Sequence, residues 1–326
     1  MDWFSTTTEA VDTAFYVALG ISVAMLILVT VLMVVFVAKY RRKRHPNAEQ
    51  IEGNTLLEIT WTVIPTILAL GMFYLGWTGY MFMKNVPKNA LEVKATGRMW
   101  AWEFEYANGK HSAELYVPQG TPVKVNLRSA DVIHSFYIPA YRVKRDVVPG
   151  LDTYVWFQPV DTGAYDIFCA EYCGQRHSYM MTKAVVVPTD EFDRWLAEDV
   201  GTTATPSGEG SFGAGTEGSG AASSEADHIA ELRRAGERLS KVKGCHACHS
   251  TDGSRLVGPT YKGVFGSTVT VVSGGQKKQI VIDNEYLRRS ILEPSADLVE
   301  GYPPVMPKTE MTEEEIAAII EYLKSL

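Results

Sequence analysis

Two thiols, an imidazole and a thioether lie within twelve residues of one another, on Cys169, Cys173, His177 and Met180. Soft and borderline donors of this kind select copper, whereas magnesium or calcium would require a cluster of oxygen ligands. Copper bound to sulfur usually has imidazole partners, so a second histidine is expected from elsewhere in the chain. His134 is the best candidate, because it follows a strand-like pattern and a second loop at the end of a β-sandwich would bring it to the cysteines.

Two other interpretations use the same residues. The cysteines could form a disulfide in an oxidising compartment, or they could make a structural Cys2His2 zinc site with His134 and His177. Neither explains Met180, since zinc has little use for a thioether. A mononuclear blue-copper site would use one cysteine, two histidines and a weak axial methionine, which leaves one cysteine over. Residue chemistry therefore favours copper, with zinc and a disulfide as the alternatives.

A second chemical motif follows, with the Cys-x-x-Cys-His spacing of covalent haem attachment: Cys245, Cys248 and His249. Two thioether bonds would fix the porphyrin, and the histidine would be the proximal iron ligand. A redox dithiol or half of a zinc site also uses Cys-x-x-Cys, but the following histidine and the helical flanks favour haem. For the distal ligand we predict Met306, because the prolines around it restrict the loop that would hold sulfur against iron.

Another methionine of the same region, Met311, is predicted to have a packing role. It precedes Thr312, which begins a capping box, and it pairs with Ile316 in a hydrophobic staple. The terminal helix has its apolar residues on one stripe, and so does the helix before the haem motif. We expect these two helices to cross, with Gly236 allowing a close approach. The remaining histidines, His45, His111, His228 and His246, are expected to face solvent.

Two long uncharged runs precede these motifs. Residues 14–38 contain 25 residues without a charge, which at about 1.5 Å per residue exceeds the roughly 30 Å core of a bilayer. A signal peptide is the alternative, but no Lys or Arg precedes this run, and it is too long for such a peptide. The basic segment 39–45 predicts a cytoplasmic turn, and the second run, 59–83, returns the chain outward. We therefore predict a transmembrane hairpin with both ends outside.

The middle of the chain alternates between apolar and polar residues with a period of two, in several short strands separated by turns such as Asn108-Gly109. This pattern indicates a Greek-key β-sandwich, with Trp102, Phe104 and Tyr106 on one packed face of a strand. A segment rich in Gly, Ser, Thr and Ala then predicts a flexible linker. We divide the chain into the hairpin with its N-terminal segment, the sandwich, the linker and the haem domain: 1–88, 89–197, 198–226 and 227–326.

The composition is that of a multidomain chain with both membrane and water-exposed parts. It has 326 residues and a net charge of −7, long enough for two or three domains. All four cysteines lie in the two metal-type spacings, so none remains for a structural disulfide. We expect no nucleic-acid partner.

The copper motif resembles a known family. Cys-x-Glu-x-Cys-Gly-x-x-His-Ser-x-Met, with Asp-Val-Ile-His-Ser-Phe upstream, is similar to subunit II of haem–copper cytochrome c oxidases. The resemblance implies a cupredoxin fold and a binuclear copper A centre with two bridging cysteines. It also implies a magnesium ion at the interface with subunit I, reached by the side chain of a glutamate. The implied copper ligands are Cys169, Cys173, His134, His177, Met180 and the backbone carbonyl of Glu171.

Two further residues take their roles from the resemblance alone. Trp100 matches the exposed tryptophan through which the family receives electrons from cytochrome c, although Ala101 stands where the family commonly has tyrosine. Glu58 lies at the cytoplasmic mouth of the second span and resembles the glutamate that opens a proton-uptake channel of subunit I. The alternative for Glu58 is a plain acidic residue favoured by the helix dipole.

Nearly the whole chain resembles subunit II of a caa-type oxidase, in which an all-α class I cytochrome c is fused to the copper domain. This implies that Gly236 lies under Tyr322, and that an external donor reduces haem c, which reduces copper near Trp100. Copper would then reduce a haem in subunit I, where oxygen becomes water and protons are pumped. The implied location is a prokaryotic cell membrane, with both redox domains periplasmic or extracellular. The implied partners are subunits I and III and a donor, either cytochrome c, a quinol–cytochrome c reductase complex or a small copper protein.

Other functions would use the same motifs. The chain could serve a nitric oxide reductase with the same copper motif, or it could be a membrane-anchored copper-binding or assembly module. A soluble nitrous oxide reductase would lack the hairpin, and Glu58 favours an oxidase. An assembly module needs one exchangeable copper, so a count of two would argue against it.

Overall fold

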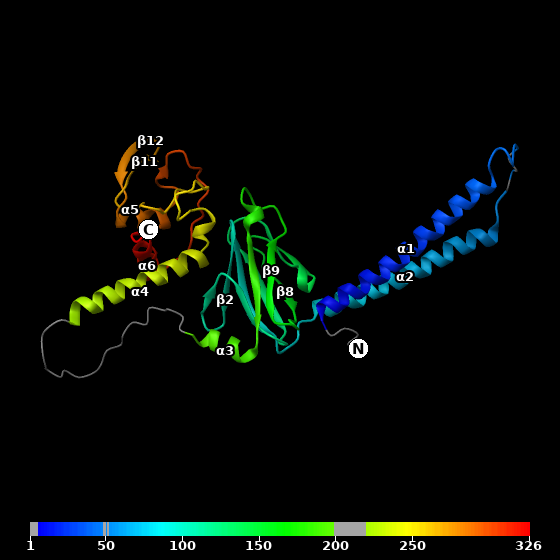
Figure 1. The fold of residues 1–326 in the computed structure, drawn as a ribbon, viewed down its shortest axis with the longest axis horizontal. Coiled ribbons are helices and arrows are strands. Elements are labelled where there is room, and N and C mark those ends of the chain that lie inside the picture. The colour runs from blue at the N-terminus through cyan, green and yellow to red at the C-terminus, as the bar shows by residue number, and fades with distance from the viewer. Residues whose placement is uncertain (1–5, 48–49, 51, 199–219) are drawn as a thin grey trace. The chain divides into compact units, whose positions relative to one another are not determined.

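The computed structural model describes residues 6–47, 50, 52–198 and 220–326 (Figure 1). They divide into two compact units. The first holds the N-terminal hairpin together with Trp156–Gln158, and the second holds the rest of the chain from Asn89 onward. Within the second unit a β-sandwich comes first in the chain, and a mainly helical domain follows it.

Two long helices form the hairpin and run side by side, α1 over Thr7–Lys39 and α2 over Thr55–Lys84 (Figure 1). Most of their apolar side chains are exposed, and both helices are long and apolar enough to cross a membrane. They extend beyond the uncharged runs 14–38 and 59–83, because polar residues at either end continue the helical hydrogen bonding. The predicted hairpin is therefore present, with longer helices.

Caps and small residues fix how these helices begin and meet. The Thr6 hydroxyl and the Asn54 carboxamide each accept a backbone N–H of the first turn, at 3.1 Å in both cases. At Gly79 of α2 an added Cβ would lie 3.7 Å from the carbonyl oxygen of Ala10 in α1. Such small residues let two helices approach closely where no hydrophobic effect drives them together.

Ten strands form a sandwich of two five-stranded sheets, in the orders β3-β2-β1-β5-β8 and β4-β10-β9-β6-β7. Neighbours in each sheet are often distant in sequence, as in a Greek-key arrangement, and β1–β5 and β4–β10 pair in parallel. The strands β1 to β10 span Leu91–Arg98, Ala101–Tyr106, His111–Ser112, Leu115–Pro118, Val123–Ser129, His134–Ile138, Val143–Val147, Thr153–Phe157, Gly163–Cys169 and Met181–Val187. Three short helices accompany them: η1 over Pro139–Tyr141, η2 over His177–Tyr179 and α3 over Thr189–Ala197.

Aromatic side chains fill the space between the sheets. Trp102, Phe104 and Tyr106 of β2 are all buried, as the alternating pattern predicts. Trp102 meets Phe136 of β6 edge to face, with ring centroids 5.2 Å apart. Because β2 and β6 belong to different sheets, this pair joins the two layers of the sandwich.

Strand β6 brings His134 close to the cysteine loop. It pairs antiparallel with β9, with Phe136 opposite Cys169, so the start of β6 and the end of β9 lie together. His134 was expected in a loop, but it is the first residue of β6. The sequence does not predict this strand because nearly all of its residues are buried, which removes the alternating pattern.

Three α-helices and one single-turn helix are described in the C-terminal domain. Helix α4 spans Gly220–Val242, η3 spans Cys245–Ala247, α5 spans Asn284–Leu292 and α6 spans Glu313–Leu323. The expected crossing of α4 and α6 is present: a Cβ on Gly236 would lie only 2.0 Å from the carbonyl oxygen of Ala318 and 2.8 Å from Cβ of Tyr322. Glycine is therefore required where the two helices touch.

This domain also carries a three-stranded sheet that the all-α prediction lacks. Its order is β12-β11-β13, over Gln276–Val281, Thr268–Ser273 and Leu298–Val299. The turn of its hairpin is Gly274-Gly275, and both glycines have positive φ. Alternating β-branched residues and a Gly-Gly turn are a hairpin signal that could have been found in the sequence.

Two predicted features depend on the chain between the domains. Helix α4 begins at Gly220, inside the 198–226 segment that was expected to be a linker. Residues 199–219 lie outside the described part of the chain, so the flexible linker stays a prediction.

Candidate copper and haem sites

The two cysteines of the copper motif lie together and are not joined. Cys169 ends β9 and Cys173 follows in the loop, and both side chains are buried. Their Sγ atoms are 3.7 Å apart, whereas a disulfide requires about 2.05 Å. Both thiols are free, so the disulfide interpretation does not describe this structure.

Each thiol faces its own imidazole. Cys169 Sγ lies 3.9 Å from Nδ1 of His134, and Cys173 Sγ lies 3.5 Å from Nδ1 of His177. The ligand atoms of His134, Cys169 and Cys173 all lie within 4.8 Å of one another, which is close enough for one metal centre. The structure thus brings a histidine from one end of β6 to a loop some thirty-five residues further on.

Two other donors complete the set. Met180 Sδ is 3.7 Å from Cys173 Sγ, and the backbone carbonyl oxygen of Glu171 is 3.2 Å from Cys169 Sγ. A tetrahedral zinc site would use the two thiols and two imidazoles and would leave these two donors unused. Six donors that include a buried thioether fit copper, and they exceed what one tetrahedral ion needs.

Burial and mutual hydrogen bonding make the two thiols unequal. The hydrogen bond between the two sulfurs lowers the pKa of Cys169 to about 3, although burial opposes this shift. The same contact, together with burial, raises the pKa of Cys173. The pKa of Cys169 is therefore the lower of the two.

A carboxylate and a tight contact fix the ring of His134. Its Nε2 lies 2.8 Å from Oδ1 of Asp131, which leaves Nδ1 facing the sulfur. Burial disfavours the protonated imidazole, but the hydrogen bonds to Asp131 and Cys169 outweigh it and raise the pKa of His134. At Gly97 a Cβ would lie 2.9 Å from the ring of Trp102 and 3.1 Å from that of His134, so only glycine leaves room for both rings.

Trp100 is attached to the cysteine loop. Its Nε1 donates a hydrogen bond to the carbonyl oxygen of Cys173 at 3.0 Å, and its indole lies along Gly174, where a Cβ would be only 3.2 Å away. The resemblance implied an exposed tryptophan, but Trp100 is only 5% exposed. The prediction of exposure was wrong because the ring packs on the glycine of the loop.

Glu171 and Glu58 are both exposed. Glu171 turns its carbonyl oxygen toward Cys169 while its side chain stays accessible. Glu58 lies in the first turn of α2, where its carboxylate also suits the positive end of the helix dipole. The magnesium and proton-uptake roles of these residues stay predictions.

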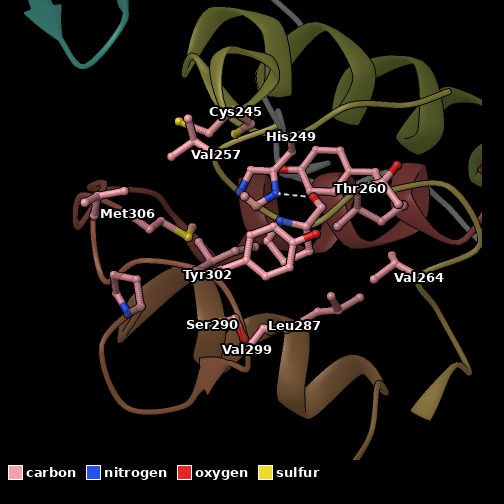
Figure 2. A pocket seen from close by; sticks show the side chains of 18 of the residues that line it. Cys245, His249, Val257, Thr260, Val264, Leu287, Ser290, Val299, Tyr302 and Met306 are labelled. Atoms are coloured by element: carbon pink, nitrogen blue, oxygen red, sulfur yellow. Dashed lines mark hydrogen bonds between the residues drawn. The ribbon is translucent and has the colours of Figure 1, made fainter. Parts of the chain in front are cut away.

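A cavity of about 480 Å³ lies beside the Cys-x-x-Cys-His motif and is lined by apolar side chains as well as by Cys245, Cys248, His249 and Met306 (Figure 2). Nδ1 of His249 lies 2.7 Å from the carbonyl oxygen of Pro259, which leaves Nε2 for a metal. Burial lowers the pKa of His249 and so favours the neutral ring that binds iron. The residues present fit a haem attached through both cysteines.

Both methionines of this domain line the cavity, so the choice of Met306 as iron ligand stays a prediction. Met306 lies on an irregular loop and directs its sulfur into the cavity (Figure 2). Met311 packs against the buried apolar cluster of α5 and α6. The predicted capping box is present at the start of α6, where Thr312 and Glu315 exchange side-chain and backbone hydrogen bonds.

One histidine outside the ligand sets is not where it was expected. His45, His111 and His228 are exposed, as predicted. His246 is half-buried: its Nε2 lies 2.8 Å from Oγ of Ser240, and its ring stacks on Tyr322 at 6.1 Å. Packing of α4 against α6 encloses this ring, which local sequence does not reveal.

Three family models match successive parts of the chain. The transmembrane domain of cytochrome c oxidase subunit II matches residues 2–74, its periplasmic domain matches 111–187, and cytochrome c matches 234–326. Cytochrome c oxidase subunit 2 of Alkalihalophilus pseudofirmus is 32% identical over 322 residues, covering 94% of this chain and 85% of that one. This chain belongs to the cytochrome c oxidase subunit II family. An alternative cytochrome c oxidase subunit 2 of Bradyrhizobium diazoefficiens is 30% identical over 202 residues, 52% of this chain and 73% of that protein.

A solved structure is also similar in part. The periplasmic domain of subunit II of cytochrome oxidase from Bradyrhizobium japonicum is 33% identical, covers 34% of this chain and 94% of its own, and superposes with a TM-score of 0.33. As a subunit II with a cytochrome c domain, the chain carries copper and haem and transfers electrons within a haem–copper oxidase. The helices α1 and α2 anchor it in a membrane, and it associates with other oxidase subunits and a redox partner. The prediction of the family and of the three-part fold is confirmed.

Proposed function

We propose that this subunit II relays electrons from an external donor through its cytochrome c domain to a binuclear copper A centre, and from there to the haem of subunit I, where oxygen is reduced to water. One observation carries the proposal. Two free thiols lie 3.7 Å apart, each faces an imidazole, and a thioether and a carbonyl oxygen complete the set. This number of donors suits two ions that share both sulfurs.

The protein would hold the two copper ions through Cys169 and Cys173 as bridges, with His134, His177, Met180 and the carbonyl oxygen of Glu171 as terminal donors. Sharing one electron between two ions lowers the rearrangement that accompanies each transfer. The chain contributes a buried site: both cysteines and Met180 are buried, and the paired strands β6 and β9 hold His134 and Cys169. Preorganised ligands of this kind keep the same geometry in both redox states.

In the cytochrome c domain, Cys245 and Cys248 would attach the porphyrin, and His249 and Met306 would bind the iron. Haem held in this way exchanges one electron at a time. His249 is oriented by the carbonyl oxygen of Pro259, and the loop of Met306 is stiffened by neighbouring prolines. The remaining apolar lining excludes water, which favours a stable low-spin site.

We assign Trp100 as the residue through which electrons reach the copper site. Its hydrogen bond to the carbonyl oxygen of Cys173 supports this role, because it joins the indole directly to a copper-ligating residue. We assign Glu58 to proton uptake into subunit I, and the exposed side chain of Glu171 to a magnesium ion at the subunit I interface. Subunit III and a cytochrome c, a cytochrome c reductase complex or a small copper protein as donor complete the proposed assembly.

The basic segment 39–45, which begins at the last residue of α1, supports a cytoplasmic position for the turn of the hairpin. Both ends of the hairpin, and with them the copper and haem domains, would then lie on the periplasmic or extracellular side of a prokaryotic membrane. Accessibility of cysteines introduced at exposed sites of the turn and of the sandwich tests this orientation in intact cells.

The test of the proposal is a metal and haem count on the native membrane complex. Beyond the metals of the partner subunits, we expect two copper ions and one covalently bound haem for each copy of this chain, with an electron paramagnetic resonance signal from one unpaired electron shared by two coppers. A single copper, or zinc in its place, would contradict the binuclear site. Oxygen consumption by the same preparation identifies the reaction, and consumption of nitric oxide in its place would contradict the oxidase assignment.

A further inference from the structure

Asp131 lies beside the copper site but is not among its ligands. It lies between β5 and β6, three residues before His134, and its side chain is only 11% exposed. The pairing of β1 with β5 fixes where this loop begins. The two strands pair in parallel up to Gly97 and Ser129, and the amide of Ala130 then donates to the carbonyl oxygen of Gly97. The carboxylate of Asp131 is therefore held over the end of β1.

The two carboxylate oxygens have different partners. Oδ1 lies 2.8 Å from Nε2 of His134 and accepts the amide of Val132 at 2.6 Å. Oδ2 accepts the amide of Met99 at 2.7 Å. One side chain thus joins a copper-ligating imidazole to the turn between β1 and β2.

That turn carries Trp100. Met99 directly precedes Trp100 in the chain. The backbone N–H that Asp131 accepts therefore belongs to the residue next to Trp100. The indole is held at its other end by the carbonyl oxygen of Cys173. The tryptophan is therefore fixed at both ends, through Asp131 on the side of His134 and through the cysteine loop on the other.

We propose that Asp131 is a positioning residue that fixes the orientation of His134 and the place of Trp100 together. The inference rests on the proposed binuclear copper site and on the role assigned to Trp100. A carboxylate that accepts the Nε2 proton keeps Nδ1 free for metal and makes the imidazole a stronger donor. Stronger donation favours the oxidised metal, so Asp131 lowers the reduction potential of the copper site.

Asp131→Asn tests this with almost no change of volume. An amide has one acceptor oxygen and one NH2 group, so the NH2 group must face the N–H of either Met99 or His134. We expect copper affinity to fall about 10- to 100-fold in competition with a chelator, as for other groups that orient metal ligands. We also expect a higher copper reduction potential, an altered copper hyperfine pattern and slower electron transfer from haem c to copper.

Asp166→Asn is the matched control. It removes the same charge from a carboxylate on β9 that is 56% exposed and pairs with Lys183 at 2.8 Å. This variant should keep the affinity, spectrum and potential of the unchanged protein. Equal copper affinity, potential and hyperfine pattern in Asp131→Asn and Asp166→Asn would overturn the inference.

A measurement on the unchanged protein keeps the inference testable if Asp131→Asn does not fold. In the fully reduced, diamagnetic protein the Nε2 proton of His134 should exchange slowly with solvent, as expected for a buried hydrogen bond to a carboxylate. Rapid exchange of this proton would overturn the inference. The copper count of the unchanged protein distinguishes the two proposals. A protein without two coppers in this chain contradicts the binuclear site. If two coppers are present but Asp131→Asn changes neither copper affinity nor potential nor hyperfine pattern, only the role of Asp131 is contradicted.

Discussion

Met180 is 1% exposed, although it lies in an irregular stretch between η2 and β10. Its thioether faces Cys173, and its carbonyl oxygen accepts the amide of Cys169 at 3.1 Å. The backbone of Met180 thus helps to hold the end of β9, while its side chain offers a donor atom. Leucine has a similar volume but no atom that can bind a metal. Met180→Leu therefore separates the structural role of the backbone from the donor role of the side chain.

Met180→Leu should keep the fold and lose one copper donor. We expect a cost of less than about 1.5 kcal/mol in the free energy of unfolding, because the exchange conserves volume. The unpaired electron should become unevenly shared between the two coppers, since one of them loses its thioether. Electron paramagnetic resonance of the copper-loaded protein measures this, and an unchanged hyperfine pattern would show that the thioether is no ligand.

The haem ligand can be tested with two methionines. Met306→Ala should abolish the low-spin, methionine-ligated spectrum and shift the haem reduction potential, because its sulfur would bind the iron. Met311→Ala should leave the spectrum unchanged and cost about 2 kcal/mol of stability, since it removes a partly buried packing contact. Visible absorption and redox titration of both variants decide the assignment, which fails if Met311→Ala alone loses the methionine-ligated spectrum.

Local sequence reveals ligands better than it reveals what orients them. Cys169, Cys173, His177 and Met180 were predicted as copper ligands from residue type and spacing, because zinc or a disulfide leaves the thioether unexplained. The function of Asp131 was not predicted, because a single aspartate before a strand is common and its contacts with Met99 and His134 arise only from the register of β1, β5 and β6. The near-complete burial of Trp100 could not be predicted for the same reason.

At the scale of helices and strands, the crossing of α4 and α6 determines the shape of the haem domain. Ile316, Ile319 and Ile320 of α6 lie in the buried cluster, and Gly236 lets the backbone of α4 touch that of α6. The amphipathic stripes of both helices and the lone glycine predicted this crossing correctly. The added sheet has a separate signal in the sequence, β-branched residues before the Gly274-Gly275 turn, which the helical stripes do not include.

Gly236→Ala should destabilise the haem domain strongly. The added methyl group would lie 2.0 Å from the carbonyl oxygen of Ala318, which is backbone and cannot move aside. We expect a loss of at least about 2 kcal/mol in the free energy of unfolding. Denaturant titration followed by haem absorbance measures it, and Arg234→Ala, at an exposed site on the same helix, should change stability by less than about 0.5 kcal/mol. Equal midpoints for the two variants would contradict the close crossing.

At the scale of the whole molecule, the fusion of the proposed donor and acceptor domains in one chain would govern how often they meet. A flexible tether of the predicted kind would keep the cytochrome c domain at an effective concentration in the millimolar range, which replaces diffusional encounter. The rate should then depend on the length of the segment before α4, residues 199–219, and little on protein concentration.

Lengthening the linker tests this dependence. Doubling its length with Gly and Ser residues should lower the effective concentration about threefold, following the −3/2 power of length. Stopped-flow oxidation of haem c measures the rate, and a variant with the same length but scrambled linker sequence is the control. A rate that does not change with length would mean that encounter between the domains does not limit the transfer.

The two free thiols 3.7 Å apart also constrain how the molecule is made. On the proposed periplasmic or extracellular side of the membrane, an inward shift of either sulfur would let them join, and both donors of the proposed copper site would be lost in one reaction. Metal insertion would then require a reduced pair. Biogenesis would have to deliver a reductant before copper, and the bound metal would protect the cysteines from oxidation.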